Sequence, residues 1–318
     1  GHSYMSLAWG ALVSATITCV YLAILRPTDT LMLPGLHGVR AAIKFGGTLT
    51  LGRMADQIGM HLPDLIIGRF LGFSAVGINS KSGSLTTAFF DFFVTAVLRV
   101  ATPALSRSSD EKHFRDSFLH LLEIVSLLQL LFFGFLILHA GPIIEVLFGR
   151  MWLECTPLLQ IGAVGGILWT PYMLASSALT ARGEAFKQMR LQLITFPFGI
   201  AMVVIGSQYS LIAISLLALA TLALRLTLLQ RVFTDSTQIR PRELLRAIRP
   251  SIFVAGTGVA AAGMPIALSS PESKNLFILL QGAFALAAGS VTAALIVRHP
   301  VIDEIHRFIG LIRNRKNA

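Results

Sequence analysis

Strongly apolar runs of roughly 17–25 residues recur along the whole chain, which is the length a helix needs to cross a bilayer core of about 30 Å. Lipid offers no hydrogen-bond partners to a free backbone, and no alternating ten-residue segments typical of a membrane barrel are visible. We therefore expect an all-α, polytopic transmembrane helix bundle of about nine spans. The expected spans are 5–25, 45–63, 72–98, 117–139, 157–178, 191–206, 209–229, 251–269 and 276–297.

The composition supports a chain with almost no water-soluble mass. Hydrophobic residues make up 54% of the chain, charged residues 13%, and the mean hydropathy is +0.72. A soluble domain carries about a quarter charged residues, so there is too little charge here to cover a globular surface. The two cysteines, Cys19 and Cys155, are expected to be small apolar fillers rather than a disulfide.

The basic residues fall mainly on one side of the expected membrane. Five segments on that side hold 20 of the 26 lysines and arginines, at 26–44, 99–115, 182–190, 231–249 and 298–316, against three on the other side. This asymmetry follows the positive-inside rule and places the N-terminus outside and the C-terminus in the cytoplasm. The net charge of +10 therefore serves topology and contact with anionic membrane lipids, and we expect no nucleic-acid partner.

The spans divide the chain into four expected parts. Residues 1–44 form one helix and a cytoplasmic connector, 45–231 a six-helix lobe, 232–297 an extra helix pair, and 298–318 a basic amphipathic tail. A short interfacial helix is expected over 238–249 and an amphipathic helix over 301–318, for which a frayed tail is the alternative. The spacing of Gly162 and Gly166 predicts close helix packing.

Polar residues inside the second expected span demand a reason, because a charge in hydrocarbon costs about 2.5–3.5 kcal/mol on insertion scales. Arg53 and Asp56 lie near the centre of 45–63, and Gln57 lies on the same helical face as Arg53. Either Arg53 and Asp56 neutralise each other within the bundle, or they face a substrate or an ion.

A second polar stripe follows in the 72–98 span. Ser80, Ser84, Thr87 and Asp91 share one helical face, and Lys81 lies beside it without an acid within one turn. Lipid cannot face such a stripe, so both polar faces are expected to line a shared hydrated cavity. For Asp91 a structural pairing and a functional role stay equally open.

Other polar groups in the spans are expected to be structural. Glu123, Arg99 and Arg225 lie near cytoplasmic span ends, where long side chains can extend to the interface, and His139 lies at an outer boundary. No HExxH, CxxC, Walker or GxSxG motif occurs, so we expect no metal, no cofactor and no catalytic residues.

Several motifs, in order, resemble one bacterial family. They are DLIIGRFLG (64–72) with AVGINSKSGSL (75–85), VATPALSR (100–107), and PIIEVLFGRMWLECTPLLQI (142–161) with its LFG-x-x-W pattern. The chain resembles the Wzx-like flippases of O-antigen and exopolysaccharide synthesis, in the oligosaccharide-lipid branch of the multidrug/oligosaccharidyl-lipid/polysaccharide exporter superfamily. In that family a basic residue often stands at the place of Lys81, whereas an aromatic is more usual than Asn79.

The resemblance implies two six-helix lobes around a cationic cavity, and alternating-access transfer of a polyprenyl-pyrophosphate-linked oligosaccharide to the outer leaflet. On that template 5–25 is the last helix of the first lobe, and about five helices of that lobe are absent, so export by this chain alone is not expected. Arg53, Lys81, Gln57 and Ser84 would bind substrate, while Asp56 and Asp91 would couple an ion or pair charges. Polysaccharide polymerase and export proteins would be further partners.

Three alternatives remain open. A drug/cation antiporter of the same superfamily would favour acids over a net basic cavity. A membrane polymerase or glycosyltransferase would normally need large outer loops rich in catalytic groups, whereas the loop at about 140–156 offers only Glu145, Arg150 and Glu154. A truncated, non-transporting remnant is the third. No bond is made or broken in the favoured function, so we expect no enzyme.

Overall fold

The computed structural model describes residues 5–25, 61–106, 110–268, 275–297 and 299–302. Its chain separates into two compact units, 1–58 and 59–318, which are treated individually below. In the first unit the described residues form one helix, α1 (Met5–Leu25), at the place of the first expected span. The expected span 45–63, with Arg53, Asp56 and Gln57, lies outside the described residues except for its last three positions.

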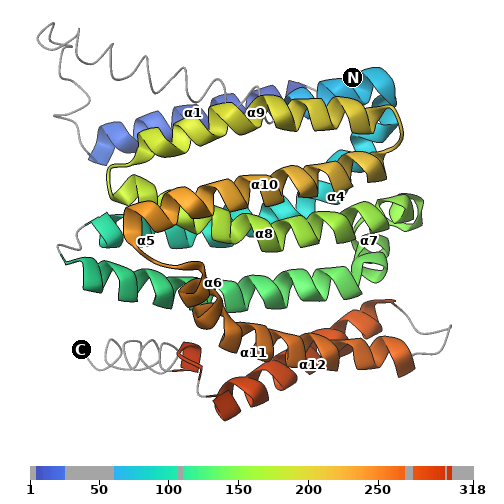
Figure 1. Cartoon of the computed structure of the whole chain (residues 1–318). Helices are drawn as coiled ribbons and strands as arrows, with labels where there is room; N and C mark the ends of the chain where they lie inside the picture. Colours follow the sequence, from blue (N-terminus) through green and yellow to red (C-terminus); the bar gives the residue numbers. More distant parts are fainter. Residues whose placement is uncertain (1–4, 26–60, 107–109, 269–274, 298, 303–318) are drawn as a thin grey trace, which may run out of the picture. The chain divides into compact units, whose positions relative to one another are not determined.

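The second unit is helical wherever it is described (Figure 1). A helix over 61–70 leads by a short turn into a long helical run. The helices that follow are α4 (Phe73–Phe89), η1 (Phe90–Val94), α5 (Thr95–Ser106), α6 (Glu111–Leu138), α7 (Ala140–Phe148), η2 (Arg150–Cys155), α8 (Thr156–Ala181), α9 (Ala185–Ser207), α10 (Leu211–Thr237), α11 (Pro241–Leu268) and α12 (Asn275–Val297).

Seven helical stretches in the described residues are long and apolar enough to cross a membrane. They are Phe73–Pro103, Glu111–Leu138, Arg150–Ala181, Phe186–Ser207, Leu211–Thr237, Pro241–Ala267 and Asn275–Val297, and they match the last seven expected spans. The apolar part of α1 that is described, Leu12–Leu25, is shorter than these. The chain is therefore an all-helical, multi-pass membrane protein with seven candidate spans in its described part.

Several helices are longer than their expected spans. The expected short span 191–206 is the 23-residue α9, and 209–229 extends to Thr237 in α10. The interfacial helix expected at 238–249 is not separate, because α11 runs without interruption from Pro241 through Pro250 to Leu268. These helices continue through polar and charged residues beyond their apolar runs. The apolar runs alone therefore underestimate the lengths of the helices. The tail expected to form a helix over 301–318 lies outside the described residues after 302.

The turns have local causes. Gly72 precedes α4 with φ of 87°, a left-handed conformation that favours glycine. Asp110 caps α6 by accepting a hydrogen bond from the Lys112 backbone N–H, and Ser210 caps α10 in the same way from Ala213. The segment expected to be an outer loop, 140–156, instead forms α7 and η2, which are joined at Gly149.

Close helix contacts depend on small residues. In this unit α11 packs along both α6 and α12, and α10 packs along α8 and α9. A methyl group at Gly166 of α8 would overlap the ring of Phe133 on α6, and Gly162 lies next to Thr86 of α4. The predicted close packing at this glycine pair is thus confirmed, with Gly166 the tighter contact.

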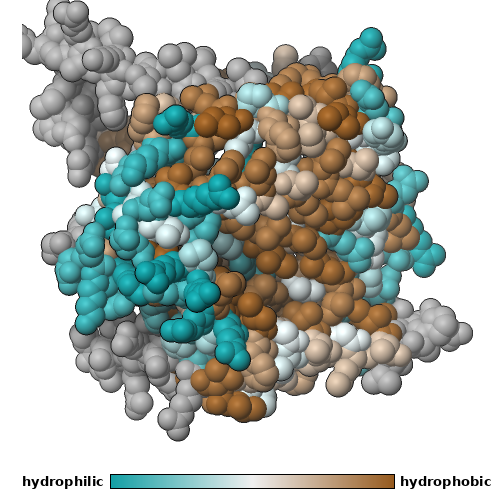
Figure 2. Space-filling view, viewed as in Figure 1, coloured by the Kyte–Doolittle hydropathy of each residue, from teal (hydrophilic) through white to brown (hydrophobic). Residues whose placement is uncertain are grey.

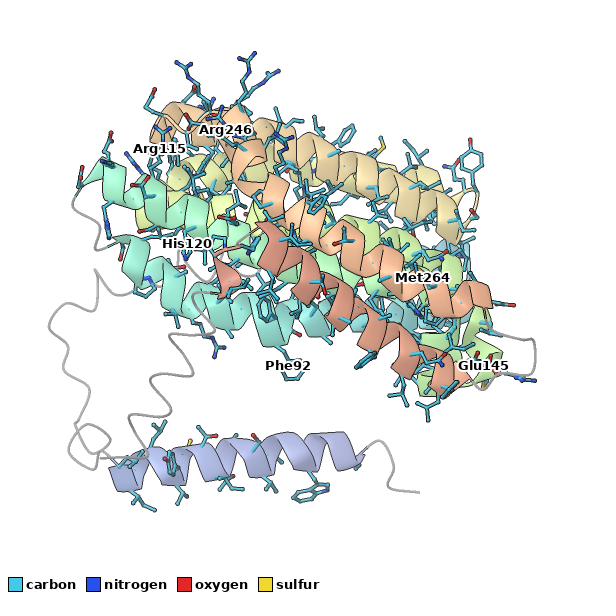
Figure 3. The ribbon with its side chains drawn as sticks, turned by 90° about the horizontal axis from the view of Figure 1, so that it is seen from below. Phe92, Arg115, His120, Glu145, Arg246 and Met264 are labelled. Carbon is cyan, nitrogen blue, oxygen red and sulfur yellow. The ribbon has the colours of Figure 1, made fainter. Side chains whose placement is uncertain are left out.

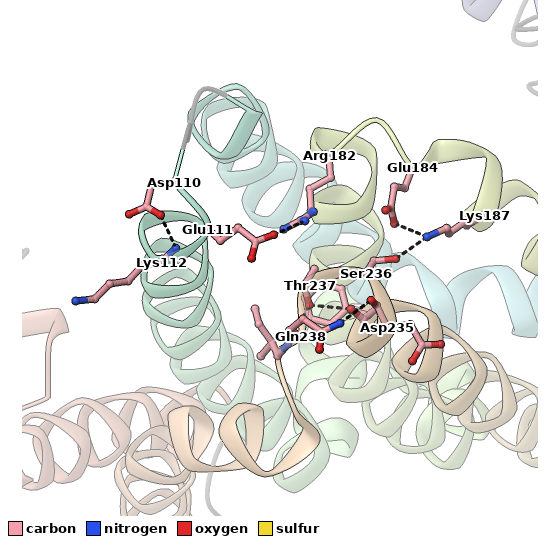
Figure 4. Close-up of polar contacts among 12 residues, drawn as sticks. Asp110, Glu111, Lys112, Arg182, Glu184, Lys187, Asp235, Ser236, Thr237 and Gln238 are labelled. Carbon is pink, nitrogen blue, oxygen red and sulfur yellow. Dashed lines mark hydrogen bonds and ion pairs between the residues drawn. The ribbon is translucent and has the colours of Figure 1, made fainter.

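An ion pair and a hydrogen bond connect the basic loops at one end of the bundle (Figure 4). Glu111 at the start of α6 pairs with Arg182 after α8 at 3.1 Å, and Lys187 of α9 donates to Ser236 near the end of α10 at 3.0 Å. Arg115 and Arg246 lie at this end in Figure 3, whereas Glu145 and Met264 lie at the other. Three of the five basic segments therefore share one end, as the charge asymmetry predicts.

Apolar side chains cover the middle of the visible face, and hydrophilic ones gather at the end where α10 finishes and α11 begins (Figure 2). Exposed large hydrophobic side chains include Ile194 of α9, Leu216 of α10, Phe253 of α11 and Phe284 of α12. Such extended apolar exposure is typical of a surface that faces lipid rather than water.

Candidate functional site

The polar residues of α4 lie on a face that the other described helices of the second unit leave exposed. Ser80, Ser84, Thr87 and Asp91 are all exposed, as the stripe spacing predicts for one helical face. The buried residues of α4 are Ala75, Ser82 and Phe89, which follow one another at seven-residue intervals on the opposite face. The helix thus turns Ala75, Ser82 and Phe89 toward the bundle and a row of four polar side chains outward, whereas a helix that contacts lipid exposes apolar side chains. We call Ser80, Ser84, Thr87 and Asp91 the α4 polar face.

Asp91 lies in the π-helical turn η1, which interrupts the α-helical ladder between α4 and α5. The neighbouring Phe89 anchors this turn by packing on the Phe132 and Phe133 rings of α6, with centroids 4.5 and 4.9 Å away. Asp91 has no hydrogen bond or ion pair in the described part of the chain. Phe92 beside it projects outward and is 84% exposed (Figure 3). Turns of this kind occur often at functional sites.

Lys81 is exposed beside the α4 polar face and contacts aromatic rings instead of an acid. Its Nζ lies 4.8 Å from the centre of the Phe148 ring and 5.7 Å from that of Trp152. Glu145, the nearby acid of α7, is bonded to Arg150 at 2.7 Å, which lowers the pKa of the Glu145 carboxyl. Cation–π contacts contribute about 0.5–2 kcal/mol and leave the ammonium charge available to an anion.

A side-chain hydrogen bond fixes the turn before the α4 polar face. The Asn79 amide of α4 donates to the Asp64 carboxylate on the helix over 61–70, at 3.3 Å. The bond crosses the Gly72 turn and joins the two arms of this helical hairpin. Asn79 therefore has a structural contact that its place in the family-like motif did not predict.

Two of the six expected site residues thus share one exposed face, and a third lies next to it. Ser84 and Asp91 belong to the α4 polar face, and the Ser84 hydroxyl donates to the Lys81 backbone carbonyl at 2.8 Å. Arg53, Asp56 and Gln57 lie outside the described residues, so whether they meet this face stays a prediction.

Three polar residues lie in surroundings that differ from the sequence interpretation. His139 was expected to be interfacial, but its side chain is buried against Phe135 and Gly282, and burial lowers its pKa. The Glu123 carboxylate was expected to extend to the interface, but it faces the buried ring of His299, just after the end of α12, at 3.7 Å.

The third residue is Arg225, whose Nε is buried without a hydrogen-bond partner. It was also expected to extend to a cytoplasmic span end, but α10 continues twelve residues beyond it to Thr237.

The described helices define a multi-pass membrane protein with a row of exposed polar side chains on one of its candidate spans. Residues 1–157 match the sequence profile of the family described as polysaccharide biosynthesis protein. This region, just under half of the chain, is therefore similar to that family.

Curated bacterial relatives agree with this assignment. The chain is 28% identical over 151 residues to the teichuronic acid biosynthesis protein TuaB of Bacillus subtilis (strain 168), covering 47% of this chain and 31% of TuaB. It is 25% identical over 181 residues to the lipopolysaccharide biosynthesis protein WzxC of Escherichia coli (strain K12), covering 55% and 37%. A match of 25% over 160 residues to an uncharacterized membrane protein in the cps region of Klebsiella pneumoniae covers 50% and 33%. The matched regions thus span about a third of each relative, and no solved structure matches.

Proposed function

We propose that this chain is part of a transporter that moves a lipid-linked oligosaccharide across the bacterial inner membrane during surface polysaccharide synthesis. The observation that carries the proposal is the exposed α4 polar face with the Lys81 ammonium beside it. The printed names of two relatives, which concern teichuronic acid and lipopolysaccharide biosynthesis, support the substrate class.

The physical argument begins with the cost of polar groups in hydrocarbon. An exposed row of two serines, a threonine and an aspartate within a candidate span is stable only beside water or another protein segment. A hydrated cavity along this face would admit a sugar chain, which forms hydrogen bonds with hydroxyl groups. The prenyl chain of the substrate would stay in the lipid.

The positive charge of Lys81 is the second feature that supports the proposal. A pyrophosphate cannot cross hydrocarbon unaided, and Lys81 offers it an ammonium that no described carboxylate neutralises. We propose that Arg53 and Gln57 join Lys81 and Ser84 in binding the substrate. Asp56 and Asp91 would bind a coupling cation or restrain Arg53 between inward-open and outward-open states.

Measurements of surface polysaccharide in variants of Lys81 test this proposal. The variants Lys81→Gln and Lys81→Arg are expressed from the complete gene in a strain lacking the chromosomal copy, with Lys112→Gln as a control at an exposed site in the first turn of α6. We expect Lys81→Gln to abolish surface polysaccharide at unchanged membrane abundance, and Lys81→Arg and Lys112→Gln to retain it. Normal polysaccharide in Lys81→Gln would refute a substrate role for this cation.

A second set separates substrate binding from charge pairing at Arg53. If Arg53 only neutralises Asp56, Arg53→Ala lowers protein abundance and the double variant Arg53→Ala/Asp56→Ala restores both abundance and export. If Arg53 binds substrate, the double variant restores abundance without export. Normal export by the double variant would exclude Arg53 from the substrate site.

A further inference from the structure

Arg225 lines an apolar cavity of the second unit that opens to the surface. The cavity has a volume of about 290 Å³, and helices α8, α9 and α10 and the helix over 61–70 form its walls. Apart from Arg225 and Thr221, its lining is apolar or aromatic, with Trp169, Phe196, Ile200 and Leu222 among the largest side chains. An arginine within a candidate span is costly to bury, so its position requires an explanation.

The Arg225 side chain points along α10 toward the N-terminus of this helix, away from the cytoplasmic span end to which it was expected to extend. Helices α9 and α10 run antiparallel, and a Cβ at Gly199 of α9 would lie 3.5 Å from both Thr221 Cγ2 and Arg225 Nη2. The guanidinium therefore lies level with Thr221, one turn before Arg225, as helical side chains lean toward the N-terminus. Thr221 is ten residues after Leu211, or about 15 Å along the helix, which is half of a bilayer core of about 30 Å.

The Arg225 guanidinium has no acidic partner among the described residues with which it could form a structural ion pair. Arg225 forms no hydrogen bond or ion pair in the described part of the chain, and its Nε is fully enclosed. The cavity lining contains no carboxylate. The Thr221 hydroxyl is used within the helix, where it donates to the Leu217 carbonyl at 2.9 Å. Arg225 is half-buried and its enclosed Nε has no acceptor among the described residues, so an anionic ligand would supply the missing partner.

From this arrangement we infer that the cavity binds an oxyanion carried on a hydrocarbon chain, such as the phosphate of a glycerophospholipid or of a prenyl phosphate. The planar guanidinium offers paired N–H donors that match phosphate oxygens, and the apolar walls suit the attached chain. The volume is near the lower limit of small-molecule sites, so the cavity holds the anionic head and the first part of the chain. The inference stands on α8, α9 and α10 and does not depend on oligosaccharide transport by the α4 polar face.

Ligand-dependent unfolding of the complete, detergent-purified protein tests the site. The variants are Arg225→Gln, which removes the charge, Ala218→Phe, which fills the cavity while keeping Arg225, and Arg231→Gln, a control at an exposed arginine on the same helix. The probes are phosphatidylglycerol, a long-chain prenyl phosphate, phosphatidylcholine and inorganic phosphate. Unfolding without added ligand shows whether each variant folds.

We expect the two chain-borne anionic phosphates to raise the unfolding temperature of the wild type and of Arg231→Gln. In Arg225→Gln and Ala218→Phe their affinity should fall by about ten- to a hundredfold, the range for a lost charge-assisted hydrogen bond. The lipid with the stronger effect identifies the source of the phosphate.

Equal binding by Arg225→Gln and the wild type would overturn the inference. Inorganic phosphate or phosphatidylcholine acting as strongly as the anionic lipids would also overturn it, because the site would then require no chain or no net charge. The transport of oligosaccharide is not measured here, so failure of this test leaves the function of the α4 polar face unaffected.

Discussion

The Nζ of Lys81 on α4 lies 4.8 Å from the centre of the Phe148 ring at the end of α7. The two residues are 67 positions apart, and the contact joins the candidate substrate helix to the segment between α6 and α8. Trp152 of η2 lies on the same ammonium at 5.7 Å. These rings hold the cation in place beside the α4 polar face without neutralising it.

Replacing Phe148 tests whether the ring positions the ammonium. Phe148→Leu keeps an apolar side chain of similar volume but removes the cation–π contact, which contributes about 0.5–2 kcal/mol. We expect reduced export at near-normal abundance in Phe148→Leu, and near-normal export in Phe148→Tyr, which keeps an aromatic ring beside the ammonium. An equal loss of export in Phe148→Tyr and Phe148→Leu would show that Phe148 does not act through a cation–π contact with Lys81.

The tight contact between α6 and α12 predicts a large effect of one methyl group. A Cβ at Gly282 would overlap the imidazole of the fully buried His139, so Gly282→Ala is expected to destabilise the protein by about 1–3 kcal/mol. Gly256→Ala on α11 meets open space and serves as the control, with a gain of about 0.5–1 kcal/mol from helix propensity. Thermal unfolding in detergent measures both, and equal stabilities would contradict the described packing of His139.

The orientation of the helices can be measured by cysteine labelling. In a background without Cys19 and Cys155, single cysteines at 110, 185 and 240 are expected to be cytoplasmic, and those at 148 and 272 outside. An impermeant thiol reagent should label only the second group in cells with a permeable outer membrane and an intact inner membrane. The ion pair between Glu111 and Arg182 requires the first two positions to behave alike. Labelling at 240 in such cells would contradict the predicted topology.

The sequence predicts the parts of this structure that depend on local periodicity. The seven described candidate spans follow from apolar run length, and the exposed α4 polar face follows from the spacing of Ser80, Ser84, Thr87 and Asp91. The close approach at Gly166 also follows from a local spacing of small residues. Each of these features is encoded within a single helix.

The features that the sequence does not predict depend on contacts between distant helices. His139 is buried because Gly282, 143 residues later, leaves room for its ring. The direction of Arg225 depends on the antiparallel packing of α9, where Gly199 admits the guanidinium. Glu123 meets His299 only because α11 and α12 fold back along α6. No periodicity within one helix contains this information.

We propose that the α4 polar face lines water inside the membrane, and thiol accessibility measures this directly. Single cysteines replace Ser80, Ser84 and Thr87, with Phe284→Cys on the apolar surface of α12 as the control. A charged methanethiosulfonate reacts with a thiolate only where water is present. We predict rapid modification at the three α4 positions in intact membranes and none at 284 until detergent is added. If the three α4 cysteines were as unreactive as the one at 284, the α4 polar face would not line water inside the membrane.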